Sequence, residues 1–467
     1  MITTNQQHLK KMKDYHSIVS NQQTFFKSGK TRDIGFRKAQ LKKFLNVLQD
    51  NERLLIDAAW KDLHKSEFET YATELGLIYG EIMLAIRKVK KWSKPKSVLT
   101  NIAALPATSR IYPEPYGTTL IIGAWNFPFL LILEPLVGAL AAGNTIILKP
   151  SELAPACSSV LAKILNGAFN PEYLRVVEGA VPETQALLKE KFDYIFFTGS
   201  TKVGKIIYKA AAEQLTPVTL ELGGKSPCIV DRDFPVKLAA KRIAWGKFIN
   251  AGQTCIAPDY LLVHREAKDE LLKYLKKYIH DFYGENPKNS PDFLRIVNKP
   301  NFDRLKELIV PEKVYTGGDT NEKELYISPT ILDNVNWADK VMEDEIFGPV
   351  LPVLTFDDFF GTIDLLKQKE KPLALYYFGK NKGRQKLILK ELNFGGGTFN
   401  DGIMHITNAR LPFGGIGHSG MGNYHGRHGF ETFSHQKSIM KRTTWIDIPL
   451  RYPPYKLSTL KIVKKLL

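Results

Sequence analysis

Two kinds of hydrophobic periodicity divide this chain of 467 residues. From about Lys38 to Lys91, apolar residues recur at three- and four-residue spacing, which predicts helices with one buried face. The next segment, "VLTNIAALPATSRIYPEPYG", is punctuated by prolines and predicts an extended arm outside the core. The pattern then changes to short apolar runs, so a different architecture begins near residue 118.

These short runs predict parallel β-strands separated by helices. The candidates up to residue 224 are "GTTLIIGAW", "GNTIILKPSE", "YLRVVEG", "YIFFTGS" and "PVTLELGG". Buried strands that alternate with helices are typical of a doubly wound nucleotide-binding domain. A second α/β block starts near "KSPCIVD" and contains the strand candidates "LLVH", "PVLPVLTF", "ALYYFG" and "GGGTFN". The expected fold class is therefore α/β, with a Rossmann-like domain and a second α/β domain.

Composition is that of a globular protein in a reducing compartment. Hydrophobic residues make up 44% of the chain and charged residues 24%, which does not favour disorder. The three cysteines form no disulfide framework and have no metal-ligand spacing, so we expect no metal site. We find no apolar signal core and no apolar run of about 20 residues, and we expect a cytoplasmic protein.

The net charge of +17 is concentrated in three segments. Residues 1–50, 87–110 and 437–467 each have an excess of seven positive charges. Solvated surface charge is the plain interpretation, and convergence of the segments on an anionic partner is the alternative. Because no nucleic-acid-binding motif accompanies the charge, we do not expect a nucleic-acid partner.

Two motifs lie where predicted strands of the first block end. In "TGSTKVG", Gly199 permits a tight turn before a helix whose N-terminus, at Ser200 and Gly204, could bind phosphate. In "ILKPSE", Lys149 and Glu152 could contact a ribose at the carboxyl edge of the sheet. A structural turn and simple helix capping are the alternatives for these two motifs.

Three further residues could supply chemistry. Glu221, in "ELGGKSP", ends a buried strand and could act as a general base, although a satisfied structural carboxylate is the alternative. Asn126, in "GAWNFPF", could donate its amide to an oxyanion or could be a turn residue. Cys255, in "GQTC", has polar neighbours that give it little apolar cover, unlike an ordinary buried cysteine. A nucleotide domain, a thiol, an acid and an amide together suit thiolate attack on an aldehyde, hydride loss to a nicotinamide, and hydrolysis of the thioester.

The chain resembles the aldehyde dehydrogenase superfamily over essentially its whole length. The resemblance rests on seven motifs in order: "WNFPF", "LKPSE", "FTGSTKVGK", "LELGGKSP", "GQTCIAPDY", "EDEIFGPVLPV" and "LPFGGIGHSGMGNYHG". Segments such as "SGKTRDIGFRKAQL" and "YHGRHGFETFSHQKS" are similar to the class 3 branch. This resemblance implies an NAD(P)-binding domain at 1–97 and 118–224, a catalytic domain at 225–424, and a small β oligomerisation arm with a C-terminal tail at 98–117 and 425–467.

The resemblance also implies roles for individual residues. Cys255 matches the nucleophile, Asn126 the oxyanion-hole amide and Glu221 the base of deacylation. The positions that match coenzyme contacts are Lys149 and Glu152 at the adenosine ribose, Gly199, Ser200 and Gly204 at the pyrophosphate, and Glu345 and Phe347 at the nicotinamide end. The coenzyme would be NAD or NADP, and the product a free acid, because Glu221 is retained.

Substrate and assembly are further expectations from the resemblance. Phe127, where relatives can carry tyrosine, is expected to make the pocket mouth apolar and to favour a fatty or aromatic aldehyde. Class 3 relatives are dimers, so a homodimer is expected. The tail "YKLSTLKIVKKLL" combines leucines at 457, 460 and 467 and Val463 with interspersed lysines at 456, 461, 464 and 465, which suits contact with an anionic inner membrane face or docking on the protein.

Two other readings of the residues stay open at this stage. A thiol hydrolase could use Cys255 with His418 as its base, but it would leave the nucleotide-binding block without a purpose. A basic binding protein without catalysis would not need Cys255, Asn126 and Glu221 together.

Overall fold

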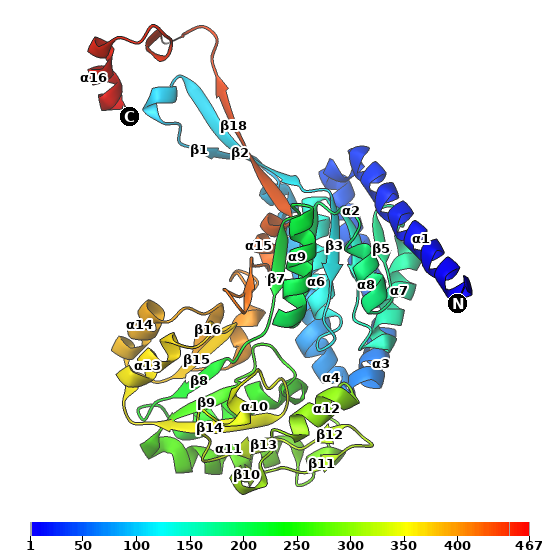
Figure 1. Cartoon of the computed structure of the whole chain (residues 1–467), viewed down its shortest axis with the longest axis vertical. Helices are drawn as coiled ribbons and strands as arrows, with labels where there is room; N and C mark the ends of the chain where they lie inside the picture. Colours follow the sequence, from blue (N-terminus) through cyan, green and yellow to red (C-terminus); the bar gives the residue numbers. More distant parts are fainter. Residues whose placement is uncertain (1, 448, 467) are drawn as a thin grey trace.

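The computed structural model describes residues 2–447 and 449–466, which form two α/β domains and a projecting β-arm (Figure 1). The first sheet has the order β17-β7-β6-β3-β4-β5, and its strands are parallel except for β17. Their bounds are β3 Thr118–Ile122, β4 Thr145–Lys149, β5 Leu174–Val176, β6 Tyr194–Thr198, β7 Val218–Glu221 and β17 Gly420–Met421. The predicted Rossmann-like domain is confirmed.

Helices cover both faces of the first sheet because its strands are apolar on both sides. Leu120 and Ile122 pack on the side of α1 (Ile2–Lys27), α8 (Val181–Leu187) and α9 (Thr201–Glu213), whereas Ile121 faces the opposite core. That opposite core contains residues of α2 Ile34–Asp50, α3 Glu52–Leu63, α5 Gly76–Trp92, α6 Leu130–Ala142, α7 Pro155–Ala168 and α15 Gly426–Thr432. Every residue of α6 is buried, as its apolar sequence predicts, and its one acid, Glu134, is paired with His425.

The second sheet has the order β10-β13-β14-β9-β8-β15-β16 and is parallel apart from β10. Its strands are β8 Pro227–Val230, β9 Tyr260–His264, β10 Val314–Thr316, β13 Thr330–Leu332, β14 Val350–Phe356, β15 Ala374–Phe378 and β16 Gly396–Phe399. The helices of this domain are α10 Val236–Phe248, α11 Lys268–Tyr283, α12 Lys299–Lys306, α13 Phe359–Lys367 and α14 Lys382–Glu391. A small hairpin pairs β11 (Thr320–Asn321) with β12 (Tyr326–Ile327).

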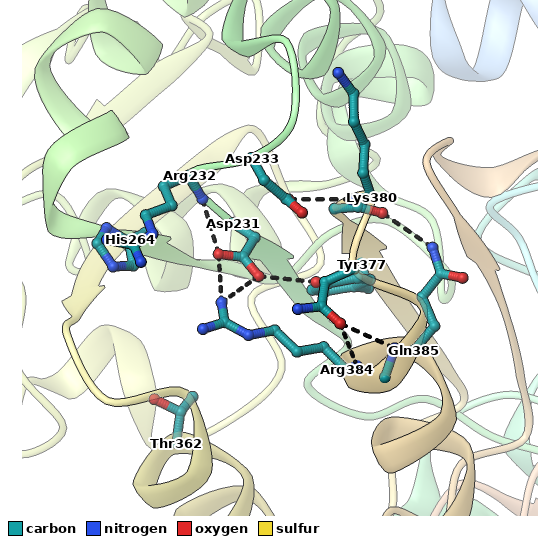
Figure 2. Close-up of polar contacts among 12 residues, drawn as sticks. Asp231, Arg232, Asp233, His264, Thr362, Tyr377, Lys380, Arg384 and Gln385 are labelled. Carbon is teal, nitrogen blue, oxygen red and sulfur yellow. Dashed lines mark hydrogen bonds and ion pairs between the residues drawn. The ribbon is translucent and has the colours of Figure 1, made fainter.

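The carboxyl edge of the second sheet is closed by an ion-pair cluster (Figure 2). Asp231, which directly follows β8, accepts hydrogen bonds from Arg384 Nη1 at 2.6 Å and from the Tyr377 hydroxyl at 2.8 Å. Its own neighbour Arg232 also donates its backbone N–H to this carboxylate at 2.9 Å. The Asp231 carboxylate is thus satisfied within the protein, and this cluster ties α14 to the sheet.

The arm is a three-stranded antiparallel sheet that projects from the first domain (Figure 1). It consists of β1 (Lys96–Val98), β2 (Ala107–Pro115) and β18 (Ser434–Arg442), with α16 (Leu457–Leu466) beyond it. Two of the three basic segments therefore meet in the arm. The first does not join them, because α1 packs against β3 and β4 of the first domain.

The C-terminal elements cross the predicted domain limits. β17 pairs with β7, and α15 packs against α6, so both belong with the first sheet although the sequence division placed them in the catalytic domain and the arm. Close packing makes this possible, since a β-carbon at Gly138 of α6 would lie 2.8 Å from the backbone of Gly429 in α15. The exact domain boundaries stay a prediction.

Candidate active site

A cavity of about 930 Å³ lies between the carboxyl edge of the first sheet and the amino edge of the second. Residues that follow β3, β4, β6 and β7 line one side, and residues that precede β8, β9 and β14 line the other. Nine of the ten predicted site residues line it: Asn126, Lys149, Glu152, Gly199, Ser200, Glu221, Cys255, Glu345 and Phe347. Gly204 is the exception. The carboxyl edge of a parallel sheet is where nucleotides bind in open α/β folds, so the cavity has the position of a coenzyme site.

Cys255 lies on the cavity wall in the turn between α10 and β9. It is partly exposed, whereas Cys157 and Cys228 are fully buried in the core. Burial, followed by the negative charges of Glu345 and Glu221, raises the pKa of the Cys255 thiol to about 12. The thiol is therefore protonated at neutral pH in the coenzyme-free protein and needs a change in its surroundings to become a nucleophile.

Asn126 is held beside the Cys255 turn by its own amide. Its Nδ2 donates to the carbonyl of Gln253 at 3.0 Å, and Nδ2 of Asn250 donates to the carbonyl of Asn126 at 2.9 Å. The side chains of Asn126, Asn250 and Gln253 are all buried. The loop after β3 and the turn before β9 are thus joined, which places an amide donor next to the thiol segment.

Glu221 ends β7 and faces the cavity with an unsatisfied carboxylate. Both carboxylate oxygens are buried and have no hydrogen-bond partner among the described residues. Burial raises the pKa of Glu221 well above its usual range. A buried carboxyl without a structural partner argues against the satisfied structural role and is typical of an acid–base group.

The opposite end of the cavity carries the predicted ribose and phosphate contacts. Lys149 Nζ donates to the carbonyl of Pro150 at 2.8 Å and lies 3.6 Å from a Glu152 oxygen, so this cation and acid are adjacent. Ser200 caps α9, accepting the Val203 N–H at 3.4 Å, which leaves the helix N-terminus at the cavity. Gly204 lies inside α9 against Leu222, where a β-carbon would approach within 2.6 Å, so its place is explained by helix packing on β7.

Glu345 and Phe347 come from the turn before β14. A β-carbon at Gly223 would overlap the Glu345 carboxylate, so the glycine is what lets the acid lie over the end of β7. Burial, reinforced by Asp259, raises the pKa of Glu345 to about 8. Phe347 has a left-handed backbone (φ 50°) and packs its ring edge-on against Trp125, 5.4 Å between centroids.

The sequence motifs did not identify several residues that lie at the site. Arg304 of α12 donates to the carbonyl of Ile346 at 2.8 Å and lines the cavity. Asn250 and Gln253 lie in the same stretch as Cys255, and their polarity between α10 and the apolar strand β9 was the available clue. Phe127, expected at the pocket mouth, is instead buried, with Lys65 Nζ 4.1 Å from its ring centre.

Comparison with known proteins identifies the family. The model of the "Aldehyde dehydrogenase family" matches residues 3–439. The chain belongs to the aldehyde dehydrogenase family. A 4,4'-diaponeurosporen-aldehyde dehydrogenase of Staphylococcus aureus is 48% identical over 434 residues, covering 92% of this chain and 95% of that protein. Aldehyde dehydrogenase family 3 member A2 of Rattus norvegicus is 46% identical over 431 residues, covering 92% and 89%.

Solved structures agree with this aldehyde dehydrogenase fold. A substrate-bound Staphylococcus aureus AldH superposes with a TM-score of 0.94 at 46% identity and covers 97% of this chain and 99% of that one. An indole-3-acetaldehyde dehydrogenase in complex with NAD+ gives a TM-score of 0.84 at 28% identity and covers 92% and 89%. The predicted superfamily and its class 3 affinity are confirmed.

The acidic neighbours of Cys255 in this aldehyde dehydrogenase predict a pH-dependent effect of Glu345→Gln. Glu345 raises the pKa of the Cys255 thiol only when the Glu345 carboxyl is ionised. Because the pKa of Glu345 is about 8, this carboxyl is ionised only in alkaline solution. The coenzyme-free variant should therefore be alkylated by iodoacetamide up to about tenfold faster at pH 9, corresponding to about one pKa unit, with little change at pH 6. Exposed Glu343→Gln is the matched control, and equal rates of wild type and Glu345→Gln at pH 9 would contradict this coupling.

Proposed function

We propose that this aldehyde dehydrogenase oxidises a hydrophobic, fatty or aromatic, aldehyde to its carboxylic acid with NAD or NADP. The observation that carries the proposal is that one cavity is lined by Cys255, Asn126 and Glu221 together with the ribose- and phosphate-binding positions. Two relatives support the substrate class, since one is a 4,4'-diaponeurosporen-aldehyde dehydrogenase and another belongs to aldehyde dehydrogenase family 3. A structural relative binds NAD+, which supports the coenzyme class.

The residues present fit a nicotinamide dinucleotide. The cavity is lined by the Lys149–Glu152 pair, by the turn at the N-terminus of α9, and by Glu345, Phe347 and Cys255. Lys149 and Glu152 would hold the adenosine ribose, the turn Gly199–Ser200 the pyrophosphate, and Glu345 and Phe347 the nicotinamide end. When bound, the coenzyme supplies the hydride acceptor.

In the proposed reaction, the Cys255 thiol gives its proton to solvent, and the resulting thiolate sulfur forms a bond to the aldehyde carbon. The carbonyl oxygen becomes an oxyanion that accepts hydrogen bonds from the Asn126 amide and the Cys255 backbone N–H. Loss of hydride from the same carbon leaves a thioester on Cys255. Glu221 then takes a proton from water, whose oxygen attacks the thioester, and the acid departs as the sulfur is released.

A panel of aldehydes, each assayed with NAD and with NADP, tests this proposal. It predicts growth of the reduced-nicotinamide absorbance, fastest with long-chain or aromatic aldehydes. A cofactor-free thiol hydrolase that uses His418 would hydrolyse esters without that signal. Its base would be the partly exposed His418, whose Nδ1 lies 3.1 Å from Glu370. Ester hydrolysis without any aldehyde-dependent reduction would overturn the proposal.

We also propose that the chain forms a homodimer through its arm. β18 is exposed along most of its length, and the arm presents apolar side chains such as Ile439 and Met440 to solvent. An exposed strand edge with apolar side chains favours pairing with another chain. Light scattering should give about twice the chain mass of 52.9 kDa, and a monomer at micromolar concentration would contradict the dimer.

The C-terminal segment is proposed to touch an anionic membrane surface. Tyr455 and Leu457 are 76% and 86% exposed, and Lys461 and Lys464 are exposed near them. Of the other tail positions in the hypothesis, Leu467 lies outside the described residues, as do the side chains of Val463 and Lys465. No helix in the described part of the chain is long and apolar enough to cross a bilayer. The proposed contact is therefore peripheral, at the inner face of the membrane.

Deletion of residues 455–467 should abolish co-sedimentation with phosphatidylglycerol vesicles and leave aldehyde oxidation unchanged. The expected loss follows from removing both the lysines and the exposed apolar side chains, and phosphatidylcholine vesicles should bind neither protein. Binding that survives the deletion, or no binding of the full chain, would remove the membrane contact from the account.

A further inference from the structure

Two buried carboxylates reach the active-site loops from one irregular helical segment. α4 (Glu67–Thr70) passes through a π-helical turn, Tyr71–Leu75, into α5, and Gly76 N–H bonds to the Tyr71 carbonyl five residues earlier. In a π-helix, residue i+5 lies about one turn from residue i, so Glu69 and Glu74 point to the same side. Both side chains are buried, so each must have a partner inside the protein.

Glu74 fixes the loop that carries Asn126. One carboxylate oxygen accepts the backbone N–H groups of Phe129 and Leu130 at 2.8 and 3.0 Å, at the start of α6. Its other oxygen accepts from Lys65 Nζ at 2.7 Å in a fully buried ion pair. An acid at a helix N-terminus satisfies otherwise unpaired N–H groups, so Glu74 sets where α6 begins, four residues after Asn126.

Glu69 fixes the turn that carries Cys255. Its Oε1 accepts the backbone N–H of Asn250 at 2.9 Å, across 181 positions of sequence. Asn250 and Ala251 both have left-handed backbones (φ 55° and 51°), a conformation that non-glycine residues adopt only at a cost. The hydrogen bond to Glu69 thus stabilises the strained backbone at Asn250.

The strained turn connects directly to the oxyanion donor. Asn250 Nδ2 donates to the carbonyls of both Asn126 and Gln253, at 2.9 and 3.0 Å, and Asn126 Nδ2 donates to the same Gln253 carbonyl. A change at Asn250 therefore moves the amide of Asn126 and the segment leading to Cys255 together.

We propose that Glu69 is a positioning residue for catalysis, which holds the Asn250 turn so that the Asn126 amide and the Cys255 sulfur stay in register. It touches neither substrate nor coenzyme and acts only through Asn250. The inference rests on the proposed function, because the register it maintains is that of the oxyanion donors and the nucleophile.

Neighbouring groups compensate for part of the cost of burying the Glu69 carboxyl. Burial raises the pKa of Glu69 to about 7, while the positive charge of Lys65 and the Asn250 N–H act in the opposite direction. Lys65 lies over Phe127 and also binds Glu74, so one buried cation serves both carboxylates. A buried acid that contributed only to folding could be replaced by an apolar side chain. An apolar side chain in place of Glu69 would leave the buried Asn250 N–H without a hydrogen-bond acceptor.

Glu69→Ala should lower the acylation rate, measured as the burst of reduced coenzyme, by about 30-fold, because small misplacement of reacting groups is costly. Coenzyme affinity should stay within about twofold, since no coenzyme-lining residue is touched. Glu69→Gln retains an acceptor oxygen and should restore most of the rate. Glu67→Gln, on the exposed side of the same helix, is the matched control and should behave as wild type.

If Glu69→Ala does not fold, the variant Asn250→Gly provides a second test of the proposal. Glycine relieves the left-handed strain, which offsets part of the stability lost with the Asn250 side chain, and loss of the amide bonds to Asn126 and Gln253 should slow acylation by about tenfold or more. A full burst in Asn250→Gly, or a Glu69→Ala enzyme that is less stable but acylates normally, would overturn the inference. An inactive wild type would instead indicate failure of the proposed function.

Discussion

Replacing Cys255 with serine should reduce aldehyde oxidation by more than about a thousandfold and leave coenzyme binding intact. A serine hydroxyl is a far weaker nucleophile than a thiolate. The variant should still bind NAD within about twofold of wild type, measured by titration of protein fluorescence, because the ribose and phosphate positions are at the other end of the cavity.

Cys157→Ala provides the control for this result. Cys157 is buried among core residues and does not line the cavity, so its loss should alter stability but not the reaction. Substantial oxidation by Cys255→Ser, or equal inactivation by Cys157→Ala, would exclude Cys255 as the nucleophile.

Glu221→Gln should convert the enzyme into one that acylates and then stalls. Without a base for the attacking water, thioester hydrolysis should slow by about 100-fold or more, and the acyl-enzyme should accumulate as a mass increase on the peptide containing Cys255. The initial burst of reduced coenzyme should persist, because Glu221 has no part in hydride loss.

The pH dependence of deacylation provides a second readout of Glu221. Burial raises the pKa of this carboxyl, and only the deprotonated form can act as a base, so wild-type deacylation should rise with pH as the carboxyl ionises. The Glu221→Gln variant should lack that rise. Unchanged hydrolysis in the variant would transfer the role of base to Glu345, the other acid beside Cys255 in the cavity.

Most strands of both sheets were predictable because their local sequences are apolar, whereas the short strands β10 and β13 were not among the predicted ones. Runs such as those of β3, β4 and β6 are apolar on both faces, which identifies parallel strands without knowledge of their neighbours. Helix α8 was not predicted, since seven residues beginning "VPETQAL" carry too short a pattern for periodicity to reveal. Its proline lies in the first turn, where a helix tolerates it.

Features that depend on distant contacts were not predictable. β17 is only two residues long and joins the first sheet by pairing with β7, about 200 positions earlier in the chain. Phe127 is removed from the expected pocket mouth by its packing under Lys65, which lies in the loop between α3 and α4. The motifs indicated which side chains could react, but the partner of Asn250 is a glutamate that no motif near Cys255 contains.

A single turnover of a hydrophobic aldehyde deuterated at its carbonyl carbon tests the central claim most directly. The claim is that Cys255 captures the same carbon that gives its hydride to a coenzyme bound in this cavity. With Glu221→Gln enzyme, the account predicts one deuterium in the reduced coenzyme for each acyl group found on Cys255 by peptide mass spectrometry. Deuterated coenzyme without an acyl group on Cys255, or acylation without deuterium transfer, would contradict it.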